Sequence, residues 1–167
     1  MKIAVICANG KEGKLIVEEA IAKGADVTAV VRGENKSAAK NVIQKDLFDL
    51  NVADLENFDV VIDAFGAWTP ETLPQHSTSL KHLCDLVSGK ETRLLVVGGA
   101  GSLYVNPEHT VLVMDGARTG KYIWGGEELT LNSKGESVIS YADYAAAMVE
   151  EALNGNHIQQ RISVVAE

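Results

Sequence analysis

Two glycines near the start of the sequence, Gly10 and Gly13, have the spacing most suggestive of chemistry. They follow the apolar run Ile3–Ile6 and accompany a helical pattern over Lys11–Lys23. A strand, a glycine turn and a helix in this order can aim the free N–H groups of the helix at a pyrophosphate. Gly10 lets a phosphate approach the backbone, and Gly13 lets the helix pack closely on the sheet. The expected nucleotide contacts of this turn are Cys7, Asn9, Gly10, Lys11, Glu12 and Gly13.

Cys7 departs from this pattern, because dinucleotide-binding turns usually begin with a glycine at that position. A thiol side chain can be accommodated there if the backbone does not require a positive φ, but its contact with a pyrophosphate would be tighter than that of a glycine. The alternative interpretation of the whole turn is structural, since turns between strands and helices often carry glycines for reasons unrelated to ligands.

Arg32 ends the second apolar run, Asp26–Val31, and lies nineteen residues past Gly13. A site that selects NAD usually places Asp or Glu there to bind the ribose hydroxyls. A guanidinium instead suits a 2′-phosphate, so the sequence favours NADP(H) over NAD(H). Two alternatives stay open: Arg32 is an ordinary solvated strand-end residue, or Glu34 pairs with it or accepts a hydrogen bond from the ribose.

Strands and helices alternate over the first hundred residues, which predicts an α/β fold with a Rossmann-like, doubly wound parallel sheet in three α/β/α layers. The expected strands are Ile3–Ile6, Asp26–Val31, Asn41–Gln44, Asp59–Asp63 and Arg93–Val97. The expected helices are Lys11–Lys23, Glu34–Lys40, Val52–Glu56 and Glu71–Ser88.

Beyond Gly99 this rhythm fails, because glycines and a proline interrupt any helical period before the next strand. Strands are expected at Thr110–Met114, Lys121–Trp124, Glu128–Leu131, Ser137–Ile139 and Arg161–Val165, with a helix at Tyr141–Leu153. No linker or repeat divides the chain, so we expect one domain over residues 1–167, in which the C-terminal part caps the sheet.

Composition limits the classes of function. The 167 residues carry a net charge of −8 and no basic cluster, which argues against nucleic acid as a partner. No apolar run is long enough for a signal peptide or a membrane span, so a cytoplasmic protein is expected.

Cys7 and Cys84 lack metal or disulfide spacing, and Cys84 is interpreted as a small buried hydrophobe. We expect no metal site.

Small residues follow two further strands, at Ala64–Ala67 and Gly98–Ser102. Ligands of open α/β sheets bind at such carboxyl ends. Asp63 is expected to cap neighbouring backbone N–H groups. Ser102 is the candidate hydrogen-bond donor to the substrate, although a structural turn serine is the alternative.

Several segments together resemble the atypical short-chain dehydrogenase/reductase group of NAD(P)H-binding proteins, and within it the NADH-flavin-reductase-like and biliverdin-reductase-B-like branch. They are Ile3–Gly13, Val30–Arg32, Lys45–Asp49, Val60–Gly66, Leu94–Ser102 and Ile139–Ala145. The resemblance implies that Asp46 and Leu47 lie along the adenine. It also implies that Ala64, Phe65 and Gly66 lie along the ribose and phosphates, with Gly98 at the cofactor and Ser102 near the nicotinamide.

Members of this group are commonly longer, with a further helix and a sixth strand between the Gly98–Gly99 turn and the segment Arg118–Tyr122. We infer that this stretch is missing here, after about Asp115. No tyrosine has a lysine four residues on, so the sequence lacks the Tyr-x-x-x-Lys pair that supplies a proton in alcohol and ketone chemistry.

Hydride transfer to a flavin does not require the missing Tyr-x-x-x-Lys pair, because two stacked rings need to be positioned and no side-chain acid is obligatory. The sequence therefore favours an NAD(P)H-dependent oxidoreductase with a small-molecule substrate, either FMN or FAD or another planar acceptor. Trp68 is a candidate wall of the flat-ring site, with a buried core tryptophan as the alternative. The competing hypotheses are a non-catalytic NAD(P)H-binding redox sensor and a ligand-free relic. Loss of a strand would also expose a sheet edge through which a homodimer could form.

Overall fold

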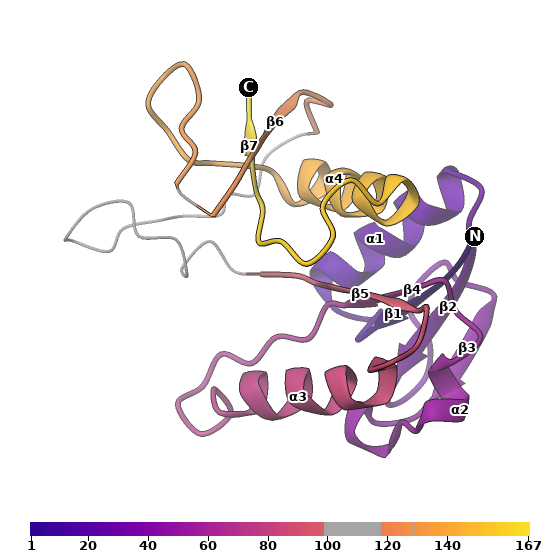
Figure 1. Ribbon diagram of the computed structural model, residues 1–167. Coiled ribbons are helices and arrows are strands. Elements are labelled where there is room, and N and C mark those ends of the chain that lie inside the picture. The colour runs from indigo at the N-terminus through magenta and orange to yellow at the C-terminus, as the bar shows by residue number, and fades with distance from the viewer. Residues whose placement is uncertain (99–117, 128) are drawn as a thin grey trace. The chain divides into compact units, whose positions relative to one another are not determined.

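A computed structural model describes residues 1–98, 118–127 and 129–167. The chain divides into two compact units, Met1–Val97 and Gly98–Glu167, which are described in turn (Figure 1). That residues 1–167 form a single domain stays a prediction. Among the described residues no helix has the length and apolar character needed to cross a membrane.

The first unit contains a five-stranded parallel sheet in the order β3-β2-β1-β4-β5. The strands are β1 (Lys2–Ile6), β2 (Asp26–Val31), β3 (Asn41–Gln44), β4 (Val60–Asp63) and β5 (Arg93–Val96). This topology confirms the expected Rossmann-like fold. The chain reverses its direction of travel across the sheet between β1 and β4, which is where ligands of such sheets bind.

Helices cover both faces of this sheet (Figure 1). α1 (Lys11–Ala22) packs on one face, and η1 (Leu47–Asp49), α2 (Val52–Leu55) and α3 (Gln75–Val87) lie on the other. The strands alternate their side chains between the two faces. One buried cluster joins Ala4, Ile6, Val30 and Val61 of the sheet to Leu47, Leu50, Leu55 and Leu83. Burial of this apolar surface holds the sheet against η1, α2 and α3.

The helix expected over Glu34–Lys40 is wrong, because this segment forms bends. The side chain of Asn35 accepts hydrogen bonds from the N–H and hydroxyl groups of Ser37 and donates one to the carbonyl of Ala39. Such local side-chain bonds offer the backbone an alternative to a helix.

Two expectations about α3 are also corrected. The helix begins at Gln75 rather than Glu71, because the preceding residues form a turn in which Thr72 and Leu73 donate to the carbonyl of Thr69. Cys84 is exposed rather than buried, so its thiol is not a core side chain.

The second unit pairs β6 (Tyr122–Gly125) with β7 (Ser163–Ala166) in an antiparallel ladder, and α4 spans Tyr141–Asn154. The strands expected at Glu128–Leu131 and Ser137–Ile139 do not form over 129–131 and 137–139. An Asn132-centred turn intervenes, in which its side chain accepts from the N–H groups of Lys134 and Glu136. The expected strand at Thr110–Met114 lies outside the described residues.

Gly13 provides a first test of this packing. A Cβ at Gly13 would lie 2.6 Å from the carbonyl oxygen of Cys7 and 2.9 Å from the Cα of Ala8, both of them backbone atoms. We expect Gly13→Ala to lower the free energy of unfolding by about 1–3 kcal/mol, since overpacking forces the helix away from the strand. Gly33→Ala is the matched control, because a Cβ there meets no atom within 4 Å. Equal urea midpoints for the two variants would contradict the close packing.

Candidate functional site

The turn between β1 and α1 is organised by backbone contacts. The N–H of Gly10 donates to the carbonyl of Cys7 over 2.9 Å, and the N–H of Lys14 donates to the carbonyl of Gly10. Gly10 occupies the N-cap of α1 in an extended conformation and contributes no side-chain cap. The positive end of the helix dipole therefore lies at the carboxyl edge of the sheet without a capping side chain from Gly10, an arrangement that suits an anion.

Cys7 occupies the left-handed region of backbone space, with φ of 59°. This is the conformation that glycine adopts freely and that costs other residues energy. Its thiol is half-buried against the apolar cluster of the first unit. Burial, helped by the nearby charge of Asp63, raises the pKa of the Cys7 thiol to about 11. The group is therefore a neutral thiol near pH 7. Residue 7 has a backbone conformation typical of glycine although it is a cysteine.

Asn9 links the glycine turn to the loop after β2. Its side-chain amide donates to the carbonyl of Glu34 over 2.8 Å, and its carbonyl oxygen accepts from the N–H of Lys36 over 2.7 Å. Both polar ends of the side chain are thus used within the protein. Asn9 positions the loop that follows Arg32, and its predicted direct contact with a cofactor stays a prediction.

Arg32 extends from the end of β2 with 83% of its side chain exposed. Its Nε lies 3.9 Å from Oδ2 of Asp46, and the other carboxylate oxygen of Asp46 accepts from the N–H of Phe48 in η1. A loose, exposed ion pair contributes little to stability. The guanidinium can therefore exchange this partner for a ligand phosphate at small cost.

The loop after β4 is fixed beside the glycine turn. Ala64 donates its N–H to the carbonyl of Ile6 at the end of β1. Asp63 accepts from the N–H of Phe65 over 3.0 Å, which confirms its expected capping role. Burial raises the pKa of Asp63 above its ordinary value.

His76 on α3 holds the same loop, a role that sequence reasoning missed. Its Nε2 lies 3.1 Å from the nitrogen and 3.0 Å from the oxygen of Ala67, and its ring meets Phe65 edge-on at 5.4 Å. Depending on its tautomer, the ring accepts from the Ala67 N–H or donates to the Ala67 carbonyl. No sequence signal beyond the proximity of a helix would have identified this contact.

Most of the predicted site residues come from carboxyl ends of neighbouring parallel strands. The glycine turn follows β1, Arg32 follows β2, Asp46 and Leu47 follow β3, and Ala64–Gly66 follow β4. Parallel strands end at one edge of a sheet, so the topology gathers these segments. Gly98 belongs to the second unit, and Ser102 lies outside the described residues.

Glu12, in the first turn of α1, is the most unusual group at this edge. Both carboxylate oxygens are buried, and neither has a hydrogen-bond partner. Burial raises the pKa of Glu12 to about 8, although the charge of Lys11 opposes the shift. A neutral carboxylic acid is therefore present over much of the physiological pH range in the first turn of α1.

Asp143 organises the second unit and was also missed as an individual residue. Its carboxylate is fully buried and accepts from the N–H groups of Thr119 and Gly120 and from the hydroxyls of Thr119 and Ser140. Burial works against ionisation, yet these hydrogen bonds hold the pKa of Asp143 below its ordinary value. Two of the conspicuous sequence segments, Arg118–Tyr122 and Ile139–Ala145, are therefore joined by one carboxylate.

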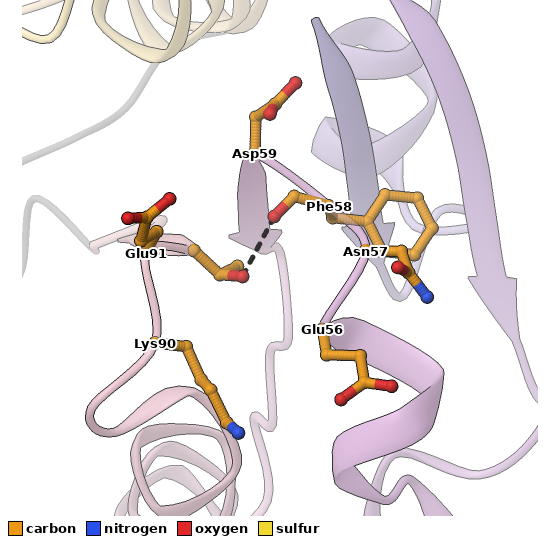
Figure 2. Close-up of a pocket in the computed structure, with 7 residues that line it drawn as sticks. Glu56, Asn57, Phe58, Asp59, Lys90 and Glu91 are labelled. Carbon is orange, nitrogen blue, oxygen red and sulfur yellow. Dashed lines mark hydrogen bonds between the residues drawn. The ribbon is translucent and has the colours of Figure 1, made fainter.

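A hollow of about 560 Å³ lies at the other edge of the sheet, before β4 and β5 (Figure 2). It is lined by Glu56, Asn57, Phe58, Asp59, Lys90, Glu91 and Thr92. The hydroxyl of Thr92 donates to the carbonyl of Phe58 across it, the dashed contact of Figure 2. Because ligands of open parallel sheets bind beyond the carboxyl ends of the strands, we do not place the nucleotide here.

The chain resembles known proteins along its whole length. It is 35% identical to the uncharacterized protein YwnB of Bacillus subtilis, with 100% of this chain and 99% of that protein covered. A crystal structure of a "putative NADH-flavin reductase" from Streptococcus pneumoniae matches with a TM-score of 0.92 and 44% identity over the full length of both chains. A Lactobacillus casei protein matches with a TM-score of 0.87 and 25% identity over 99% of each chain. No family model matches.

The chain belongs to the atypical short-chain dehydrogenase/reductase group of NAD(P)H-binding proteins. Comparison with this family also bears on why the alternation of strands and helices stops after β5. The alignment with YwnB extends over 212 residues, 45 more than the 167 of this chain, so at least that many positions of the alignment have no counterpart here. This agrees with a missing internal stretch, while its location after about Asp115 stays a prediction.

The backbone at Cys7 can be tested by comparing two substitutions. At an ordinary position Ala is more stable than Gly by about 0.5–1 kcal/mol. At φ of 59° the order should reverse, with Cys7→Gly more stable than Cys7→Ala by about 1 kcal/mol, because the Cβ is strained there. Urea unfolding measures both variants. The ordinary order, with Ala above Gly, would show that residue 7 does not require the left-handed conformation.

The buried carboxyl of Glu12 predicts a pH-dependent stability. Between pH 4.5 and about 8 the unfolded chain releases the Glu12 proton while the native protein keeps it. The free energy of unfolding should therefore fall as pH rises, by on the order of 1 kcal/mol per pH unit at most. Glu12→Gln lacks this proton, so its difference from the wild type should grow towards alkaline pH. Parallel stability profiles for the two proteins would contradict the assignment.

Proposed function

We propose that the protein is an NAD(P)H-dependent oxidoreductase that reduces a flavin or another planar acceptor. The observation that carries the proposal is the β1–α1 turn, where Gly10 leaves the amino end of α1 without a side-chain cap at the topological switch point. The description of the Streptococcus pneumoniae neighbour as an NADH-flavin reductase supports the same activity.

The proposed reaction transfers a hydride from C4 of the reduced nicotinamide to N5 of the flavin. The nicotinamide is oxidised, and the flavin takes up a proton from water to complete its two-electron reduction. This step needs two stacked rings at short range and no tyrosine–lysine pair. Backbone N–H groups at the start of α1 would hold the pyrophosphate, and Ser102 stays the candidate donor near the nicotinamide.

Arg32 is proposed to select NADP(H) by binding its 2′-phosphate. Its exposed guanidinium and loose ion pair with Asp46 favour this role. The description of the Streptococcus pneumoniae neighbour names NADH instead. The preference for NADP(H) over NAD(H) is therefore proposed from Arg32 alone. An NADH-selective protein would leave Arg32 as a solvated partner of Asp46.

The cofactor preference can be measured by titrating the protein with NADPH and NADH while following fluorescence. We expect Arg32→Ala to weaken NADPH binding about tenfold, as for loss of one charge-assisted contact, and to leave NADH binding nearly unchanged. Lys90→Ala is the control, since it removes a cation from the other edge of the sheet. Equal effects of Arg32→Ala on both nucleotides would refute the 2′-phosphate role.

Turnover is measured by adding FMN to the NADPH-saturated protein and following the loss of reduced-nicotinamide absorbance above the protein-free rate. Loss of absorbance supports the reductase. Binding of nucleotide without turnover of FMN, FAD or riboflavin would indicate a redox sensor instead. Failure to bind either nucleotide would indicate a ligand-free relic in which Cys7 or the missing stretch has disabled the site.

A further inference from the structure

We propose that Trp68 is the stacking surface for the planar acceptor. This inference rests on the proposed reductase function and assigns its flat-ring substrate to one side chain. Three observations carry it: the exposure of the indole, the position of its loop at the carboxyl edge of the sheet, and the contacts that fix the residues on either side.

Trp68 is 86% exposed, whereas the next most exposed large apolar side chain among the described residues is Ile158 at 52%. Its exposure rules out the core tryptophan that the sequence left open. Indole rings carry a large apolar area and bind flat rings through their faces. A nearly bare indole is therefore costly in water and available to an aromatic ligand.

Trp68 follows the end of β4 by five residues, so it belongs to a loop that leaves the carboxyl edge of the sheet, where the cofactor is proposed to bind. Strand β4 is paired directly with β1. The N–H of Ala64 in that loop bonds to Ile6, the last residue before the glycine turn. Both segments thus leave the carboxyl edge of the sheet from adjacent strands, where an acceptor must lie to meet the nicotinamide.

One edge of the indole lies against the backbone of its own loop. A Cβ added to Gly66 would lie 3.1 Å from Cζ2 and 3.4 Å from Cε2 and Nε1 of Trp68, so the ring edge rests against the Gly66 backbone. The residues flanking Trp68 are fixed as well. Ala67 is bound by His76, and the N–H of Thr69 donates to the hydroxyl of Thr72. The backbone on both sides of Trp68 is therefore positioned before a ligand binds, which lowers the entropy cost of presenting the indole.

Two other flat rings, the nicotinamide and the adenine of the cofactor, could stack on the same indole. The flavin is favoured because its three-ring system offers a larger flat surface to the exposed indole than adenine or nicotinamide does. The experiment separates these occupants by measuring nucleotide and flavin binding independently.

The test is the dissociation constant of FMN, measured by flavin fluorescence with the protein saturated in NADP⁺, for wild type, Trp68→Ala and Trp68→Phe. Loss of one base–aromatic stack predicts about a ten- to hundred-fold weaker FMN complex for Trp68→Ala. Trp68→Phe should retain most of the affinity, because an aromatic face remains. Leu73→Ala is the control, an exposed apolar residue of the same region with 51% exposure.

NADPH binding is then measured for the same variants. Unchanged NADPH affinity, together with the weakened FMN complex, supports the inference. Weakened NADPH binding with unchanged FMN binding would assign the ring to the cofactor, and equal loss of both would assign it a structural role; either result overturns the proposal. So does wild-type-like FMN binding by Trp68→Ala, or no FMN binding by the wild type.

The two proposals fail in different ways. If FMN binds through Trp68 but no NADPH oxidation follows, the reductase function fails and the stacking surface stands. If the wild type reduces FMN and Trp68→Ala does so with the same KM, the reductase stands and the stacking surface fails. A rise in the KM for FMN that leaves the KM for NADPH unchanged is the kinetic signature expected when both hold.

Discussion

The close approach of α1 to β1 is the contact on which the candidate site depends. Gly13 brings the first turn of the helix against the backbone of Cys7 and Ala8, at distances that leave no room for a Cβ. This contact brings the amino end of α1 to the edge of the sheet, and the hydrogen bonds of Ala64 and Asn9 then add the loops after β4 and β2. The β1–α1 segment is thus tied to two other segments of the candidate site.

Two residues in this turn stabilise the fold less than the usual residues would. Cys7 keeps a conformation suited to glycine, and Glu12 buries a carboxyl group without a partner. Strain and unpaired polar groups that persist in an otherwise well-packed fold concentrate at functional sites. Both features lie beside the proposed pyrophosphate position, so they would tune nucleotide affinity rather than create it.

The sequence predicted the parallel sheet well because its strands are short apolar runs bounded by turn residues, and the bounds of β2 and β3 agree with the structure. It failed at Glu34–Lys40 and at the start of α3, where Asn35 and Thr69 satisfy backbone groups locally. Glycine spacing supplied the candidate site residues of the β1–α1 turn, and their contacts with a nucleotide stay predictions. The roles of His76 and Asp143 were missed, because each side chain binds backbone atoms of a separate segment and such a contact leaves no periodic signal in the sequence.

Hydride transfer between flat rings suits a chain that lacks a stretch of its family's length. The glycine turn, Arg32, the Ala64–Gly66 loop and Trp68 all belong to Met1–Val97, the unit that contains the five-stranded sheet. Reduction of a ketone by general acid catalysis needs a side chain, such as a tyrosine, positioned to donate a proton to the substrate. A reaction driven by proximity needs only a bound nucleotide and a flat surface beside it, and the first unit supplies candidates for both.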